Sequence, residues 1–194
     1  QALASSQNLP VLRLYDSILD RRPATYIEKM GFSRSTEGDY VHLSTAIGGL
    51  THGATVEENV NAYATFANSG QFLDAYMIER IEDLDGNIVY EHKVEPVEVF
   101  SPETAYMMTD MLRDVLQEGG TATLGKSQLK FSSDFAAKTG TTQDHKDVWL
   151  VGYNPNISIG VWLGYSQPRT LFAFNNRYQH PSNRVNRLWA NYLN

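Results

Sequence analysis

Cysteine is absent from this sequence of 194 residues, histidine occurs only five times, and basic residues are outnumbered by acidic ones. Without cysteine there is no disulfide, no thiolate nucleophile and no thiolate metal ligand. The histidines are scattered rather than spaced as metal ligands, so we expect neither a metal nor another cofactor. The net charge of -6 is opposite to the basic surface of a nucleic-acid-binding protein. Nucleic acid is therefore not an expected partner.

A membrane-spanning run of apolar residues is also missing. The longest uncharged stretch, residues 148–168, is interrupted by Asn154, Pro155 and Asn156, and its two halves are typical of strands. The first ten residues lack the basic and apolar regions of a signal peptide, and the sequence does not begin with methionine. We therefore interpret the chain as an excised or processed piece of a longer protein.

The hydrophobic pattern that is present predicts a mixed α/β domain. Helical spacing of apolar residues predicts helices over 10–19, 23–30, 56–67, 102–116 and a final stretch that includes 185–193. Alternation around Asp85-Gly86 predicts a β-hairpin within 76–92. Three consecutive antiparallel strands are predicted over 135–142, 148–153 and 157–165, and we expect the final helix to cover their sheet. Residues 31–54, rich in Ser, Thr and Gly, are predicted to be a loop region.

The motif with the clearest chemistry is Lys138-Thr139-Gly140-Thr141-Thr142, at the end of a predicted strand. An ammonium group and hydroxyls on a strand edge form a platform for a carboxylate or an oxyanion, and the glycine lets a ligand approach the backbone. Lys-Thr-Gly is rare by chance in a chain of this composition, whereas a Ser-x-Asn triplet such as Ser6-Gln7-Asn8 is expected about once. The two motifs are therefore informative only together and in this order.

This pair of motifs resembles the penicillin-binding transpeptidases, and within them the class A, bifunctional enzymes of bacterial cell-wall synthesis. The resemblance extends to residues 61–68, 104–112, 151–153 and 160–162, and so covers essentially the whole chain. It implies an α/β fold in which helices flank a central antiparallel β-sheet, as in serine β-lactamases. We interpret residues 1–194 as the C-terminal part of a single transpeptidase domain, so that the fold is incomplete in this chain.

One element of the family pattern is missing. The family's nucleophilic serine lies in a Ser-x-x-Lys motif N-terminal to the Ser-x-Asn triplet, and only residues 1–5 precede that triplet here. Ser127-Gln128-Leu129-Lys130 fits Ser-x-x-Lys but lies C-terminal to Ser6, so we interpret Ser127 as an ordinary loop serine. The nucleophile is expected in the N-terminal part of the same protein, which would then be a partner of this chain.

The resemblance also implies roles for individual residues. Ser6 and Lys138 would relay a proton to the leaving group, and Asn8 would hydrogen-bond the amide of the acyl donor. The hydroxyls of Thr139 and Thr141 would bind the terminal carboxylate of the substrate, and the backbone N–H of Thr141 would donate to the oxyanion. Gly140 would let the substrate lie antiparallel to the strand.

The implied reaction is acyl transfer from a D-Ala-D-Ala peptide, so the expected partners are peptidoglycan stem peptides and β-lactam antibiotics. The expected location is the outer face of the bacterial cytoplasmic membrane, with the anchor outside this chain. A D,D-carboxypeptidase or β-lactamase of the same fold, or a catalytically inactive peptidoglycan-binding module, are the alternatives. His145, Asp144 and Asp147 are weaker candidates, which we interpret as parts of a polar, charged turn.

Overall fold

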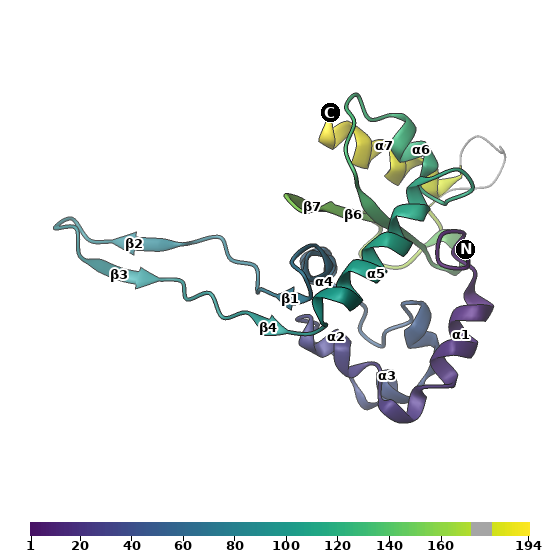
Figure 1. The fold of residues 1–194 in the computed structure, drawn as a ribbon, viewed down its shortest axis with the longest axis horizontal. Coiled ribbons are helices and arrows are strands. Elements are labelled where there is room, and N and C mark those ends of the chain that lie inside the picture. The colour runs from purple at the N-terminus through teal and green to yellow at the C-terminus, as the bar shows by residue number, and fades with distance from the viewer. Residues whose placement is uncertain (172–179) are drawn as a thin grey trace.

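A three-stranded antiparallel sheet forms the centre of the fold (Figure 1). The computed structural model describes residues 1–171 and 180–194. Strands β5 (Ala136–Thr141), β6 (Asp147–Asn154) and β7 (Ile157–Gly164) lie in the order β5-β6-β7. The three predicted strands are therefore confirmed, with small shifts at their ends. The tight connection from β6 to β7 is stabilised by the Asn154 side chain, whose Oδ1 accepts hydrogen bonds from the backbone N–H groups of Asn156 and Ile157.

Helices pack on both faces of this sheet. Helix α7 (Pro181–Leu193) lies so close to the sheet that a Cβ atom added at Gly152 of β6 would be 2.5 Å from the Trp189 ring of α7. On the opposite face, helix α4 (Val56–Ala67) brings Val60 Cγ2 to 2.4 Å from the position of a Cβ at Gly160. A glycine is therefore needed at each point of contact. The predicted fold class, helices flanking an antiparallel sheet, is confirmed.

The core lies on both faces of the sheet, against α7, α4 and helix α5 (Pro102–Arg113), and Tyr63 and Phe66 of α4 pack on Tyr153. Helix α5 begins as predicted, with the Ser101 hydroxyl accepting the N–H of Thr104. A 3₁₀ turn (Asp114–Leu116) and the short helix α6 (Thr123–Ser127) follow it, and α6 was not predicted. Apolar side chains from these elements fill the core: Leu112, Val115, Leu116, Ala122, Phe135, Val148, Leu150, Tyr153, Val185 and Trp189.

The N-terminal third is helical and packs below the sheet in Figure 1. It contains α1 (Asn8–Asp16), α2 (Thr25–Lys29), α3 (Glu37–Val41) and 3₁₀ turns at Leu19–Arg21 and Leu43–Ile47. The prediction of a loop throughout 31–54 is therefore wrong, because α3 and the second turn lie within it. Across the described residues, no helix combines the length and the apolar character required to cross a membrane.

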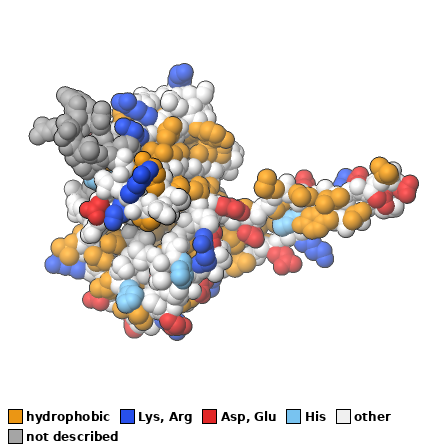
Figure 2. Space-filling model, turned by 180° about the vertical axis from the view of Figure 1, so that it is seen from behind, with side chains coloured by type: hydrophobic (Ala, Val, Ile, Leu, Met, Phe, Trp, Pro, Cys, Tyr) orange, Lys and Arg blue, Asp and Glu red, His pale blue; other side chains and the backbone are white. Residues whose placement is uncertain are grey.

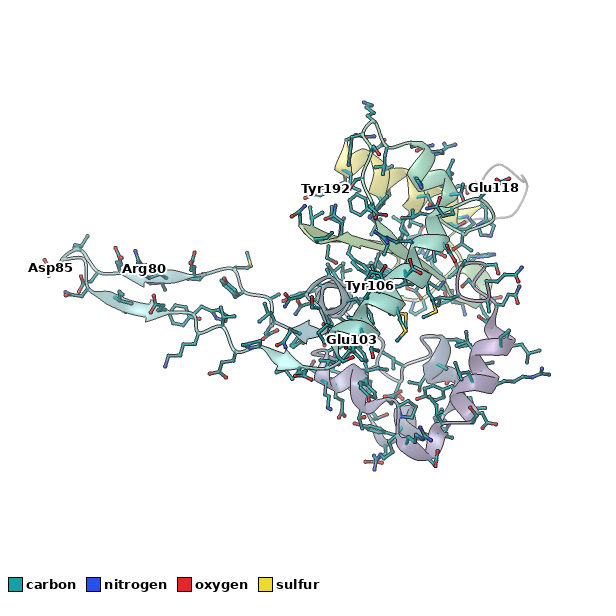
Figure 3. The ribbon with its side chains drawn as sticks, in the orientation of Figure 1. Arg80, Asp85, Glu103, Tyr106, Glu118 and Tyr192 are labelled. Atoms are coloured by element: carbon teal, nitrogen blue, oxygen red, sulfur yellow. The ribbon has the colours of Figure 1, made fainter. Side chains whose placement is uncertain are left out.

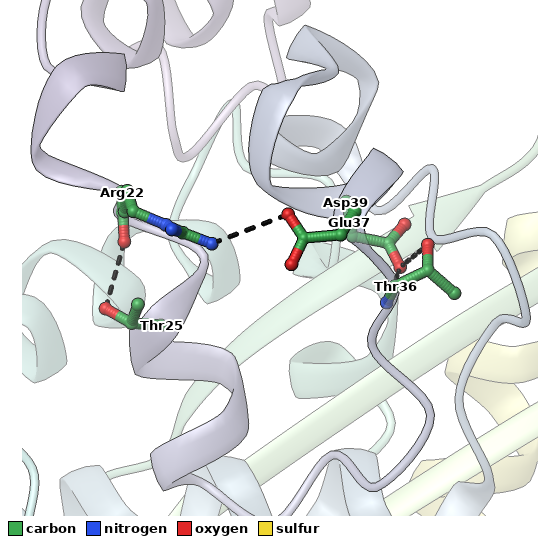
Figure 4. Close-up of polar contacts among 5 residues, drawn as sticks. All are labelled: Arg22, Thr25, Thr36, Glu37 and Asp39. Carbon is green, nitrogen blue, oxygen red and sulfur yellow. Dashed lines mark hydrogen bonds and ion pairs between the residues drawn. The ribbon is translucent and has the colours of Figure 1, made fainter.

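A buried carboxylate explains why this Ser- and Thr-rich region is ordered (Figure 4). The Asp39 carboxylate accepts hydrogen bonds from the backbone N–H and the hydroxyl of both Thr36 and Thr51, at 2.8 to 3.0 Å. These bonds to the charged form lower the pKa of Asp39 to about 2. A nearby ion pair between Arg22 and Glu37, at 3.7 Å, is exposed and contributes little.

The predicted hairpin is confirmed and forms a long arm that projects from the body (Figures 1 and 3). It consists of β2 (Arg80–Glu82) and β3 (Ile88–Glu91), joined through Asp85-Gly86, and a second ladder of β1 (Gln71–Phe72) with β4 (Val97–Glu98) lies at its base. Every residue of β2 and β3 is exposed, so the alternating pattern buries neither face.

Acidic and apolar side chains both lie along this arm (Figure 2). Residues 74–98 contain eight acidic and two basic residues, which is a net charge of -6. The net charge of the whole chain is also -6, so the rest of the protein is electrically balanced.

Candidate active site

Lys138 on β5 contacts Ser6, a residue 132 positions away in the sequence. Its Nζ donates one hydrogen bond to Ser6 Oγ at 2.8 Å and another to the backbone carbonyl of Thr139 at 2.7 Å. Lys138 lies opposite Val151 in the sheet, on the face that α4 covers. The structure therefore brings together the two motifs that the sequence analysis singled out.

Burial changes the acid–base behaviour of this lysine. Removal from water disfavours the ammonium form and lowers the pKa of Lys138 from 10.5 to about 8. At neutral pH the side chain is still mostly protonated, and two of its three N–H groups already have acceptors. Lys138 is therefore held as an oriented cation whose proton is released more easily than that of a surface lysine.

A tight turn at the N-terminus positions the Ser6 hydroxyl. The backbone N–H groups of Ser6 and Gln7 donate to the carbonyls of Leu3 and Ala2, at 3.2 and 2.9 Å. Ser6 has a φ of 54°, which is an unfavourable conformation for a residue other than glycine. Asn8 follows as the exposed first residue of α1, and its side chain has no hydrogen-bond partner within 1–171 and 180–194. The Asn8 amide is thus open to a ligand.

The outer edge of β5 is open to an extended ligand. Within the described part of the chain, β5 pairs only with β6. Thr139 and Thr141 share one face of this edge strand, opposite to the face of Lys138. The missing side chain at Gly140 leaves the backbone accessible, although a Cβ there would contact Trp149 at 3.3 Å. Such an edge can accept a peptide as an additional antiparallel strand.

The two threonines differ in exposure. Thr141 is exposed, whereas Thr139 is buried at 8% exposure and its Oγ1 lies 2.5 Å from Thr121 Oγ1. The backbone N–H of Thr121 also donates to the Ala4 carbonyl at 3.2 Å, so this residue contacts one motif at Thr139 and the turn just before the other motif. Thr121 was not among the residues predicted from the sequence. The only sequence signal near it is the preceding Gly119-Gly120 pair, which is typical of a turn after the helix predicted over 102–116.

The weaker candidates have other partners. Asp144 forms an ion pair with Lys146 at 3.5 Å, and Asp147 accepts a hydrogen bond from the Trp162 indole at 3.0 Å. His145 packs its ring edge-to-face on another histidine. No cluster of three or more His, Asp or Glu residues that could bind a metal occurs in residues 1–171 and 180–194.

Ser127 is the last residue of α6, so the interpretation of it as a loop serine is wrong about its local structure. Its hydroxyl donates to the Leu124 carbonyl at 2.9 Å, a local helix contact.

Comparison with known proteins is consistent with this geometry. Residues 1–170 match the model of the penicillin-binding protein transpeptidase domain. The chain belongs to this family. The resemblance inferred from the motifs is therefore confirmed.

Two curated relatives illustrate the match. Penicillin-binding protein 4 of Bacillus subtilis is 31% identical over 170 residues, and penicillin-binding protein 1A of Neisseria flavescens is 35% identical over 182 residues. Each alignment covers 88% of this chain but only 26% and 21% of the relative. The chain thus spans about a quarter of the length of these relatives.

Solved structures support the fold. Penicillin-binding protein 1A from Haemophilus influenzae is similar over 99% of this chain and 33% of its own, with a TM-score of 0.80 and 22% identity. The PonA1 protein from Mycobacterium tuberculosis, solved in complex with penicillin V, covers 98% of this chain and 55% of its own. Its TM-score is 0.73 at 22% identity.

Proposed function

We propose that this chain supplies the Ser-x-Asn and Lys-Thr-Gly motifs of a peptidoglycan D,D-transpeptidase. The enzyme cross-links stem peptides by acyl transfer from D-Ala-D-Ala through a serine acyl-enzyme, and β-lactams inhibit it by acylating the same serine. The contact between Lys138 Nζ and Ser6 Oγ, beside an open strand edge, is the observation that carries this proposal. The nucleophilic serine comes from a part of the protein outside residues 1–194.

In this mechanism Ser6 delivers the proton that the leaving group needs. The nucleophilic serine gives its proton to the lysine of its own Ser-x-x-Lys motif and attacks the carbonyl carbon of the penultimate D-Ala. An ester forms, and the C–N bond to the terminal D-Ala breaks. Because Ser6 Oγ accepts a hydrogen bond from the Lys138 ammonium, its own proton remains free to move to the departing amine. Lys138 then replaces that proton, which its lowered pKa of about 8 favours.

The remaining site residues bind the substrate. The acyl donor lies antiparallel to β5, its terminal carboxylate near the hydroxyls of Thr139 and Thr141 and its amide near Asn8. The backbone N–H of Thr141 donates to the oxyanion that forms during attack. A β-lactam carries a carboxylate at the corresponding place. A second stem peptide provides the acceptor amine, so the protein acts on the outer face of the membrane, where peptidoglycan is assembled.

Two alanine variants of the complete protein test the assignment. Ser6→Ala and Lys138→Ala are each expected to slow acylation by a fluorescent penicillin by about 100-fold or more, since each removes a step of the proton path. Ser17→Ala and Lys126→Ala are matched controls, because their side chains contact Leu14 and Gln117 rather than the site. Near-normal labelling of both site variants would refute the assignment.

Product analysis distinguishes a transpeptidase from a D,D-carboxypeptidase. The complete protein is incubated with a D-Ala-D-Ala peptide and an amine acceptor, and products are separated by mass. Accumulation of the cross-linked amide is expected. Release of D-Ala with only hydrolysed peptide would instead identify a carboxypeptidase that uses the same residues.

A further inference from the structure

Thr121 closes a ring of contacts around the two motifs. Starting from Ser6, the ring passes through Lys138 Nζ to the Thr139 carbonyl, then from Thr139 Oγ1 to Thr121 Oγ1. It returns from the Thr121 backbone N–H to the carbonyl of Ala4, two residues before Ser6. Thr121, which belongs to neither motif, thus links Thr139 of one motif to the turn that precedes Ser6 of the other.

The loop that carries Thr121 is firmly anchored. Its neighbour Ala122 is completely buried, and the N–H of Ala122 donates to the Val115 carbonyl at 2.9 Å. A side chain at Gly120 is excluded, because a Cβ atom there would be 2.2 Å from the same carbonyl oxygen. The position of the Thr121 hydroxyl is therefore set by the core rather than by the ligand.

This position determines what the Thr139 hydroxyl can do. A threonine hydroxyl has one proton to donate and two lone pairs that accept. If Thr121 donates to Thr139 Oγ1, the single proton of Thr139 stays available for a carboxylate at the edge of β5. We propose that Thr121 is a positioning residue that acts in this way. Its hydroxyl orients the Thr139 O–H toward the substrate carboxylate, and its backbone N–H fixes the Ser6 turn at the same point.

The test compares benzylpenicillin with its methyl ester, which lacks the charged carboxylate. The second-order acylation rate constant is measured for both compounds on the complete protein, and the acid-to-ester ratio reports carboxylate recognition alone. Thr121→Val keeps the shape of the side chain and removes the hydroxyl, and it is expected to lower this ratio about tenfold. Thr121→Ser restores the hydroxyl and is expected to restore the ratio.

Two further variants make the result specific. Thr139→Val is expected to lower the ratio at least as much, and adding Thr121→Val to it should have no further effect, because both act through one hydroxyl. Thr123→Val is the matched control: its hydroxyl contacts only the Gln117 and Gly120 carbonyls in the same loop, so the ratio should not change.

This inference rests on the proposed function, but the two fail differently. If the unmodified protein is not acylated by benzylpenicillin, the proposed function is wrong and the inference falls with it. If the unmodified protein is acylated and prefers the acid, but Thr121→Val slows acid and ester equally or leaves the ratio unchanged, only the role of Thr121 is overturned.

Discussion

The lowered pKa of Lys138 predicts an alkaline limit to acylation. If the ammonium form of Lys138 is required, the acylation rate follows the protonated fraction of this side chain. With a pKa of about 8 this fraction falls from about 90% at pH 7 to about 10% at pH 9, a roughly tenfold decrease. A lysine with the ordinary pKa of 10.5 would lose only a few per cent over the same range.

Initial rates of labelling by a fluorescent penicillin between pH 6 and 10 measure this effect on the complete protein. Lys138→Arg is the informative variant, because arginine stays protonated throughout this range. We expect it to be slower at every pH and to lack the alkaline decrease centred near pH 8. A flat profile of the unmodified protein up to pH 9.5, or an unchanged decrease in Lys138→Arg, would refute the reasoning.

Three further predictions concern the fold around the site. The hydrogen bonds that lower the pKa of Asp39 to about 2 stabilise the folded state above about pH 4, and this stabilisation is lost as the pH falls toward 2. Asp39→Asn should lower the free energy of unfolding, measured in urea at pH 7, by about 2 kcal/mol and should remove this part of its pH dependence. Gly152→Val should lower the thermal midpoint, since the added carbons collide with Trp189, and an unchanged midpoint would contradict the packing described. Replacing residues 78–93 of the arm by a short glycine turn should leave penicillin labelling within twofold, because every residue of β2 and β3 is exposed and Arg80 and Asp85 lie on the arm that projects from the body (Figure 3). A large loss of labelling would show that the arm supports the site.

Local sequence signals predicted the elements whose contacts are local. The capping box of Thr55 and Glu58 is present with both reciprocal bonds, at 3.1 and 2.8 Å. The hairpin turn has Gly86 at a φ of 85°, as Asp-Gly suggested. These features depend on residues three or four positions apart, so the sequence displays them directly.

Contacts between distant residues were not accessible in this way. Helix α3 begins with a local pair, Thr36 and Asp39, but Asp39 also binds Thr51, 12 positions later, and the residues between Asp39 and Thr51 show no helical apolar pattern. The pairing of Thr121 with Thr139 needs the loop and the strand already folded. That Ser6 meets Lys138 was expected only because the motifs resemble those of a family, since no periodicity relates residues 132 positions apart.

The central claim is that this chain provides the proton-relay and substrate-binding half of a penicillin-reactive site. The most direct test is to acylate the complete protein with a fluorescent penicillin, digest it and identify the labelled peptide by mass spectrometry. We expect a label on a serine outside residues 1–194, in a Ser-x-x-Lys sequence, and loss of that label in Lys138→Ala. A label on Ser127 or elsewhere within residues 1–194, or no label at all, would contradict it.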